Sequence, residues 1–307
     1  MSLSACTDSE FTCNDGSCID MDKKCDGRED CSDGDEENNC EKIITFAGYN
    51  RHIVPAPLEG DSTLIMNIGF TIAEIVNIDE KNGFFKVVTA FVRQWYNPQL
   101  KYRNLKRNAS LNRMTPADRK TMWIPWTTFD NVEYIDSFQE TDVPDILDVV
   151  PNADFKHTKG DKTNQQNTWT FEGSENKISY ERKVSINCFC DFDMKWYPFD
   201  IQLCDIQLFH QERSISMRPM TVKYKGARRL AQHTVLSVNI CSATVKDRPG
   251  VLVEVVLGRP LFGSILTAYL PTVVLVILSQ LLGRFHRRFM DIVIAENITL
   301  LLVLSFL

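Results

Sequence analysis

The ten cysteines of this chain are distributed very unevenly, and this distribution limits what the chain can fold into. Six of them lie within the first 40 residues, at Cys6, Cys13, Cys18, Cys25, Cys31 and Cys40. Six cysteines in so short a stretch predict a disulfide framework, which requires an oxidising compartment. A zinc site is the alternative, but the stretch has no CxxC pair and no histidine. We therefore predict a small cross-linked module.

The remaining composition excludes two classes of protein. A charged fraction of 24% with 44% hydrophobic residues is typical of folded protein, and the net charge of -6 gives no basic excess for nucleic acid. The five histidines have no nucleophile or metal-ligand spacing beside them, so we predict no enzyme. They are His52, His157, His210, His233 and His286.

Residues 42–258 carry short runs rich in Val, Ile, Phe, Thr and Tyr, such as GFFKVVTAFVRQWY and GVLVEVVLG. Clusters of Asn, Asp, Gly and Pro separate these runs, and no long helical period interrupts them. This pattern favours an antiparallel β-sandwich over an α/β fold.

Residues 259–307 are expected to enter a membrane. The 24 residues between Arg259 and Arg284 carry no charge, which is long enough for a helix across a bilayer, with Pro271 tolerated as a kink. The basic run RFHRR that follows is expected in the cytoplasm, and everything before Arg259 outside the cell. A buried core helix is the alternative. A second apolar run, IVIAENITLLLVLSFL, contains one ionisable residue, Glu296.

These segments predict a multi-pass protein of the plasma membrane with an extracellular N-terminal region. The first residues, MSLSACTDSE, have no signal-peptide pattern, and the chain stops inside the second apolar run. We therefore expect a fragment of a longer chain, truncated in its second membrane helix.

Residues 1–41 resemble a low-density lipoprotein receptor class A repeat in their cysteine spacing, in Phe11 and Ile19, and in CDGREDCSDGDEE. The resemblance implies the pairs Cys6–Cys18, Cys13–Cys31 and Cys25–Cys40 and a structural calcium ion. The implied side-chain ligands are Asp26, Asp30, Glu36 and Glu37. The family usually has Ser at position 35 and Asp at position 36, so the choice between Asp35 and Glu36 stays open. A solvated acidic face is the alternative. Such repeats bind many proteins, so an extracellular protein partner is expected.

The stretch CDFDMKWYPFDIQLC, from Cys190 to Cys204, resembles the signature loop of the Cys-loop, or pentameric ligand-gated, ion channels. NIDEKNG, FVRQWYNPQLKY, WIPW and GRP match the same family in order, although Trp126 replaces its usual aspartate. The resemblance implies a Cys190–Cys204 disulfide and an extracellular sandwich over residues 42–258. It also implies a four-helix membrane domain, of which residues 259–307 hold two helices, and a homo- or heteropentamer. An unrelated hairpin disulfide is the alternative.

In that family the loop rests on the membrane helices. An apolar tip of Trp196, Tyr197, Pro198 and Phe199 suits helix ends and lipid headgroups. The residues expected to couple the sandwich to the pore are Asp79, Glu80, Pro198, Phe199, Asp200 and Arg259. Among them, Asp200 and either Asp79 or Glu80 are expected to pair with Arg259. An ordinary surface ion pair is the alternative.

The ligand site of the family lies between subunits and is often an aromatic cage around a cationic amine. Here Gln211 stands where an aromatic residue is common, and NICSATVKDRPGVL contains no aromatic residue. Phe91, Arg93 and Phe129 are the other expected ligand-binding residues. We therefore expect a small-molecule agonist other than an amine, or no agonist.

The resemblance also bears on the pore and on three remaining features. Glu296, Thr299, Val303 and Phe306 (or Leu307) fall on one helical face and would form rings around a pore. Because the Pro-Ala-Arg run of anion channels is absent, we predict cation selectivity, with anion selectivity as the alternative.

Asn108 is a predicted glycosylation site, whereas Asn297 matches the same pattern inside the membrane. Cys188 and Cys241 either pair or stay free.

The prediction is thus a subunit of an extracellular ligand-gated cation channel. A binding or endocytic receptor that uses the class A repeat, a soluble relative of the channel sandwich, and a structural subunit without a ligand are the alternatives.

Overall fold

The computed structural model describes residues 6–7, 9–38, 40–137, 145–159, 168–260, 262, 265–282, 294–295 and 298. The chain forms two compact units. The first comprises Met1–Phe189, Asp205–Gly226 and Asn239–Glu254, and the second comprises Cys190–Cys204, Ala227–Val238 and Val255–Leu307.

The cysteine-rich module at the N-terminus belongs to the first unit. Strands β1 (Glu10–Thr12) and β2 (Cys18–Asp20) pair antiparallel, and the 3-10 turns η1 (Met21–Lys23) and η2 (Asp35–Glu37) follow. Its buried core consists of Phe11, Cys13, Met21 and Cys31. So small a core needs covalent support, and three disulfides supply it: Cys6–Cys18, Cys13–Cys31 and Cys25–Cys40. These are the pairs that the resemblance implies.

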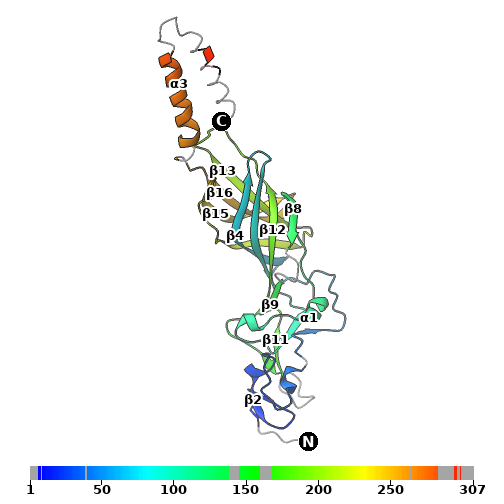
Figure 1. Cartoon of the computed structure of the whole chain (residues 1–307). Coiled ribbons are helices and arrows are strands. Elements are labelled where there is room, and N and C mark those ends of the chain that lie inside the picture. Colours follow the sequence, from blue (N-terminus) through cyan, green and yellow to red (C-terminus); the bar gives the residue numbers. More distant parts are fainter. Residues whose placement is uncertain are drawn as a thin grey trace. The chain divides into compact units, whose positions relative to one another are not determined.

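The rest of the chain is dominated by strands, as Figure 1 shows. The elements after the module are β3 (Ile43–Thr45), β4 (Leu64–Asp79), β5 (Phe84–Trp95), β6 (Leu100–Arg103), η3 (Ala109–Leu111), α1 (Pro116–Thr121), β7 (Thr127–Phe129), β8 (Val132–Ser137), β9 (Ile146–Val150), β10 (Thr158–Lys159), β11 (Trp169–Glu172), β12 (Lys177–Phe189), β13 (Ile201–His210), β14 (Ile215–Tyr224), β15 (Thr234–Val245), β16 (Arg248–Gly258), the π-helical turn η4 (Ile265–Tyr269) and α3 (Leu270–Leu282).

The strands form an all-β sandwich, and the predicted order of a disulfide-rich module followed by a sandwich is confirmed. One sheet has the order β14-β4-β5-β12-β8, with β9 also paired to β12, and another has the order β15-β16-β13-β7. A smaller sheet has the order β10-β11-β6-β3. Side chains of β4 and β5 alternate between buried and partly exposed, because successive residues of a strand point to opposite faces.

The prediction of an entirely antiparallel sandwich is wrong for one pair of strands. Strand β14 runs parallel to β4, with Ile215 opposite Leu64. Strands β13 and β14 belong to different sheets, so the short segment between them is not a hairpin within one sheet. The composition of a strand does not record its direction, and the sequence therefore gave no sign of this pairing.

The second unit contains the Cys190–Cys204 disulfide, η4 and α3. The hydroxyl of Tyr269 in η4 donates to the backbone oxygen of Tyr197 at 3.1 Å. Helix α3 has 13 residues. Of the helices in the described part of the chain, none has the length and apolar character needed to cross a bilayer. The predicted membrane spans stay predictions.

Candidate functional site

A pocket of about 390 Å³ lies in the first unit between β5, β12, β7 and the WIPW segment. Arginines and aromatic residues dominate its walls. The lining residues are Phe91, Arg93, Ile124, Pro125, Trp126, Thr127, Phe129, Ile135, Tyr180, Arg182 and Val184.

The pairing of β5 with β12 explains why these side chains meet. Arg93 lies opposite Tyr180 and Phe91 lies opposite Arg182. Residues two apart on a strand share a face, so both pairs point into the same space. Strand β7 closes it with Phe129, whose ring packs edge-on against Phe91 at 5.4 Å.

Arg93 is a buried cation, with only 4% of its surface exposed. Its Nη1 donates to the backbone oxygen of Pro125 and, at 3.3 Å, to the hydroxyl of Thr127. The guanidinium lies 4.3 Å from the ring centroid of Tyr180 and 5.1 Å from that of Phe91. Burial lowers the pKa of Arg93 to about 10, which still leaves the side chain charged at neutral pH.

Two observations show that this charge is poorly compensated. The buried Nε atom of Arg93 has no hydrogen-bond partner. Within the described part of the chain, Arg93 also forms no ion pair with a carboxylate. A buried charge without a counter-ion carries a desolvation penalty of several kcal/mol. A negatively charged group in the pocket would therefore interact favourably with Arg93.

The second pocket arginine, Arg182, is only loosely paired. Its Nε lies 3.9 Å from Oδ1 of Asp145. The other carboxylate oxygen of Asp145, Oδ2, accepts a hydrogen bond from the hydroxyl of Tyr180. Burial, reinforced by that bond to Asp145, raises the pKa of Tyr180 to about 12, so the phenol stays protonated. One nearby carboxylate thus serves two guanidinium groups, and the pocket keeps a positive balance.

The structure brings together three of the four residues predicted to bind ligand. Phe91, Arg93 and Phe129 line the pocket, whereas Gln211 is exposed just after β13 and does not line it. The sequence reasoning missed Tyr180 and Arg182. Their alternation in KISYERKVS marks a shared face, but only the register with β5 places that face opposite Arg93.

The four residues assigned to calcium lie on the acidic loop of the module, where Glu37 and Glu36 contact the backbone N–H groups of Asp26 and Asp30. Glu37 Oε1 accepts from the backbone N–H of Asp26 at 2.9 Å, and Glu36 Oε1 accepts from the backbone N–H groups of Asp30 and Cys31. The Glu36 carboxylate is fully buried, and its second oxygen, Oε2, has no hydrogen-bond partner. Lys23 forms an ion pair of 2.7 Å with Asp30. These hydrogen bonds link Glu37 to Asp26 and Glu36 to Asp30 within one loop.

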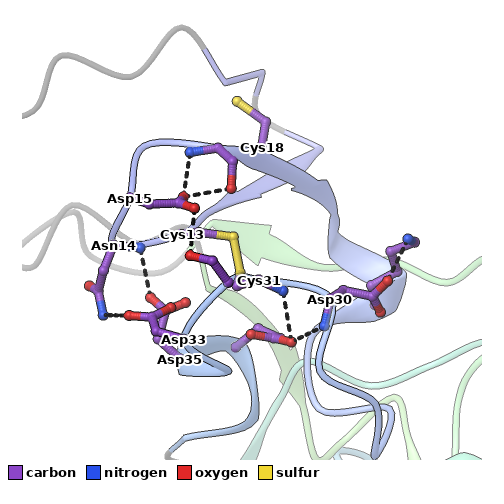
Figure 2. Close-up of a disulfide and its surroundings, with 12 residues drawn as sticks. Cys13, Asn14, Asp15, Cys18, Asp30, Cys31, Asp33 and Asp35 are labelled. Atoms are coloured by element: carbon purple, nitrogen blue, oxygen red, sulfur yellow. Dashed lines mark hydrogen bonds and ion pairs between the residues drawn. A yellow bond between two sulfur atoms is a disulfide. The ribbon is translucent and has the colours of Figure 1, made fainter.

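Asp35 points elsewhere. Its Oδ2 accepts from the backbone N–H of Asn14 at 3.0 Å, and the Asn14 side chain donates to Asp33. Figure 2 shows Asp33 and Asp35 on one side of the Cys13–Cys31 disulfide and Asp30 on the other. Asp35 lies close to Cys13 and Cys31. Because these two sulfurs are bonded to each other, they are not available as metal ligands.

In the second unit, the Cys190–Cys204 loop holds a buried ion pair between Asp200 and Arg259. Nε and Nη2 of Arg259 each donate at 2.9 Å to a separate oxygen of Asp200. Gln202 also donates to Asp200 at 2.6 Å. The hydrogen bond from Arg259 is the main reason that the pKa of Asp200 falls to about 2. The guanidinium also lies 4.7 Å from the ring centroid of Tyr197.

The tip of the loop is apolar and open to solvent. The exposed apolar side chains are Trp196, Tyr197, Phe199, Ile201 and Leu203, while Pro198 is buried. An apolar groove of about 340 Å³ runs beside Pro198, Phe199 and Leu236. Asp79 and Glu80 lie in the first unit, where Asp79 accepts two hydrogen bonds from Asn82 at 3.0 and 2.8 Å.

The remaining predicted residues have simple positions. Cys188 is a buried free thiol whose pKa burial raises above its usual range, and Cys241 is an exposed free thiol. Asn108 is exposed and caps the 3-10 turn η3 by accepting from the backbone N–H of Ser110 at 3.1 Å. The four predicted pore residues, Glu296, Thr299, Val303 and Phe306, lie outside the described residues.

Comparison with known proteins identifies both parts of the chain. A family model of the neurotransmitter-gated ion-channel ligand binding domain matches residues 40–217, more than half of the chain. The chain belongs to this family. A model of the low-density lipoprotein receptor domain class A matches residues 4–40.

The curated relatives of this channel-family chain include receptors with different ligands. A glutamate-gated chloride channel of Drosophila melanogaster is 22% identical over 175 residues, which is 56% of this chain and 33% of the relative. Neuronal acetylcholine receptor subunit alpha-2 of Gallus gallus is 27% identical over 163 residues, 53% of this chain and 25% of the relative. Acetylcholine receptor subunit beta-type acr-2 of Caenorhabditis elegans is 23% identical over 164 residues, 53% of this chain and 24% of the relative.

The chain therefore spans between a quarter and a third of the length of these relatives. The matched range of the channel family contains every pocket residue and the whole Cys190–Cys204 loop, but it ends before Arg259. Members of the family are ligand-gated ion channels, which are not enzymes, so the prediction that the chain is not an enzyme is confirmed.

Proposed function

We propose that this chain is a subunit of an extracellular ligand-gated ion channel and that its agonist carries a carboxylate. The observation that carries the proposal is the buried guanidinium of Arg93 in the pocket, which forms no ion pair within the described residues and shares the one nearby carboxylate, Asp145, with Arg182. A carboxylate can accept two parallel hydrogen bonds from a guanidinium, and Nε of Arg93 is buried without a partner. A bound anion would offset the desolvation penalty of the buried guanidinium.

The surroundings of Arg93 favour an anion over an amine. A cationic ligand would enter a pocket that already holds two guanidinium groups and only one nearby carboxylate, and like charges repel across so short a distance. The aromatic rings of Phe91 and Tyr180 are already occupied by the Arg93 cation. Among the relatives, the glutamate-gated channel is named for an acidic ligand, which supports this choice.

Transmission from the sandwich is proposed to pass through the Cys190–Cys204 loop. Its apolar tip suits membrane helices and lipid headgroups, and the Asp200–Arg259 pair ties the loop to the residue that precedes the apolar segment. Asp79, Glu80, Pro198 and Phe199 complete the proposed coupling set. A contact with two alternative arrangements would let a small movement in one domain bias another.

The proposal also covers the wider architecture of the chain. We propose a repeat over residues 1–41, a sandwich over 42–258 and the start of a membrane domain over 259–307. The subunit would assemble as a homo- or heteropentamer in the plasma membrane, with Asn108 glycosylated outside. Glu296, Thr299, Val303 and Phe306 would line a cation-conducting pore. Reversal potentials in sodium- and chloride-substituted solutions test this selectivity, and a reversal that follows chloride would contradict the role of Glu296.

Calcium fits the acidic loop of the module. The buried Oε2 of Glu36 lacks a hydrogen-bond partner, as expected for an oxygen reserved for a cation. Asp26, Asp30 and Glu37 share the loop with it and supply the hard oxygen ligands that Ca²⁺ prefers. A bound Ca²⁺ would neutralise this cluster and hold the loop together, so we propose Asp26, Asp30, Glu36 and Glu37 as its side-chain ligands.

The ligand proposal is tested by recording currents from the channel in oocytes. Acidic amino acids such as glutamate are compared with acetylcholine, and Arg93→Gln is compared with Arg213→Gln, a control at an exposed position. We expect a response to the acidic ligand, a loss of about 100-fold in its potency with Arg93→Gln and no change with Arg213→Gln. An acetylcholine response that Arg93→Gln leaves intact would contradict the proposal. If currents appear only with a second subunit and Arg93→Gln does not change them, the chain is better described as a structural subunit that binds no ligand.

A further inference from the structure

The class A module is packed against its own sandwich through a buried lysine. Lys106, in the segment after β6, is 4% exposed, and its Nζ donates to the backbone oxygens of Met21 at 2.8 Å and Asp22 at 2.7 Å. Both oxygens belong to η1. A buried ammonium group is found in proteins only where its hydrogen bonds and charge are satisfied.

The carboxylates of the module supply that charge compensation. Burial lowers the pKa of Lys106 to about 8, while Asp22, Asp26 and Glu37 act in the opposite direction. Two of these, Asp26 and Glu37, are proposed calcium ligands. The sandwich thus inserts its lysine beside the acidic loop of the module.

The sandwich holds Lys106 in place from its own side. Asn112 is fully buried, accepts from the backbone N–H of Lys106 at 2.6 Å and donates to its carbonyl at 2.8 Å. The same amide also donates to Val149 O of β9 at 3.2 Å. The backbone of Lys106 is therefore held by Asn112, which also ties it to β9.

An apolar contact accompanies the lysine. Trp169 of β11 packs against the module core of Phe11, Cys13, Met21 and Cys31. The indole also stacks on His157 with ring centroids 4.3 Å apart. Figure 1 shows the blue module next to β11. An indole held between a core and a stacked ring has little freedom to leave.

From these contacts we infer that the partner of the class A module is its own sandwich, and that calcium in the module controls the order of the sandwich segment 100–112. The turn η1 is continuous with the loop that carries Asp26 and Asp30. Calcium would fix this loop and, through the Met21 and Asp22 carbonyls, the ammonium group of Lys106. By linkage, a Lys106 contact that calcium orders raises the calcium affinity of the module by the same factor, and the inference requires this gain to exceed the repulsion between the ammonium group and the bound cation.

The inference is tested by hydrogen–deuterium exchange on the full chain, with calcium and after chelation, so its outcome does not depend on channel activity. Lys106→Met removes the donor but keeps the aliphatic stem. Lys101→Met is the control, because Lys101 is an exposed lysine of β6 that pairs with Glu172. Calcium affinity is measured in parallel by calorimetry.

In the unmodified chain, chelation should increase exchange over residues 100–112. Lys106→Met should show that increase even with calcium present and should bind calcium about tenfold more weakly. Lys101→Met should match the unmodified chain. The amides of β4 and β5 report overall folding; if Lys106→Met unfolds them, Lys106→Gln, which keeps an N–H donor, takes its place. Unchanged exchange over residues 100–112 after chelation, or unchanged calcium affinity in the Lys106 variant, would overturn the inference.

Discussion

Arg259 holds both carboxylate oxygens of Asp200 at 2.9 Å, and the two side chains are 6% and 1% exposed. This is a bidentate pair in a water-poor setting, where one partner left alone is costly. The pair joins the Cys190–Cys204 loop to the residue that precedes the long apolar segment, so it is the contact through which the proposed coupling is most directly tested.

Asp200→Asn should destabilise the second unit by about 3–5 kcal/mol and shift gating to higher agonist concentration, because Arg259 would remain buried without its counter-charge. Dose–response curves and surface labelling measure both effects. Asp193→Asn in the same loop is the control, since Asp193 is exposed and its ion pair with Lys195 is long, at 3.6 Å. The double variant with Arg259→Gln should cost less than the sum of the single variants. Strict additivity would show that the pair does not act as a unit.

Acid should weaken this pair only at low pH. The pKa of Asp200 is about 2 in the folded chain, below its usual value of 3.8, so the folded state binds fewer protons than the unfolded state between these values. The stabilisation is complete above about pH 5 and is lost as the pH falls through 2. Thermal denaturation between pH 2 and 7 should show this loss for the unmodified chain. The Asp200→Asn variant should lack this acid-dependent loss of stability. An equal acid sensitivity of the variant and the unmodified chain would contradict the assignment of the loss to Asp200.

Cys190→Ser should abolish assembly or gating, because the loop loses the cross-link that restricts it. Removing a structural disulfide typically costs 2–5 kcal/mol. Surface expression and agonist-evoked current measure the effect. Cys241→Ser is the matched control, since Cys241 is an exposed free thiol and its replacement should change neither quantity. A Cys190→Ser channel that reaches the surface and gates normally would refute the coupling role.

Arg93→Met should leave the fold almost as stable as before, within about 1 kcal/mol, although the residue is buried. The substitution gives up the hydrogen bonds to Pro125 and Thr127 but also removes a buried and poorly compensated charge. Chemical denaturation gives the free energy of unfolding. A loss of several kcal/mol would mean that the arginine serves the fold and not a ligand.

Glu36→Gln should weaken calcium binding by the module about 10- to 100-fold, whereas Asp35→Asn should have little effect. Glu36 offers a buried oxygen to the acidic loop, while Asp35 accepts from Asn14 on the other side of the disulfide. Calorimetric titration with calcium separates the two variants. The reverse order would assign the ligand to Asp35.

The sequence predicted those parts of the molecule that depend on local spacing. The cysteine intervals and the run of β-forming residues that becomes β5 are both properties of neighbouring positions. Arg93 was predicted as a ligand residue, and the structure places it in the pocket wall with Phe91 and Phe129.

Long-range register was not predictable in the same way. Tyr180 meets Arg93 only because β12 pairs with β5 in one of several possible registers, and a shift of one residue would turn Tyr180 to the other face. Lys106 was likewise unremarkable in the sequence. Its burial depends on Met21 and Asp22, which lie more than eighty positions away and expose their carbonyls only once the module has folded.

Phe91, Arg93 and Trp95 occupy alternate positions of β5, and all three are buried. Whether Arg93 faces the pocket is thus determined by its place in the alternation of side chains along β5. Inserting or deleting a single residue just before Trp95, with Trp95 kept in the core, would present Val92 or Gln94 to the pocket instead. In related chains, such a change of length would remove the buried Arg93 guanidinium from the pocket wall in a single step and leave Arg182 as its arginine, without the loss of any arginine from the sequence.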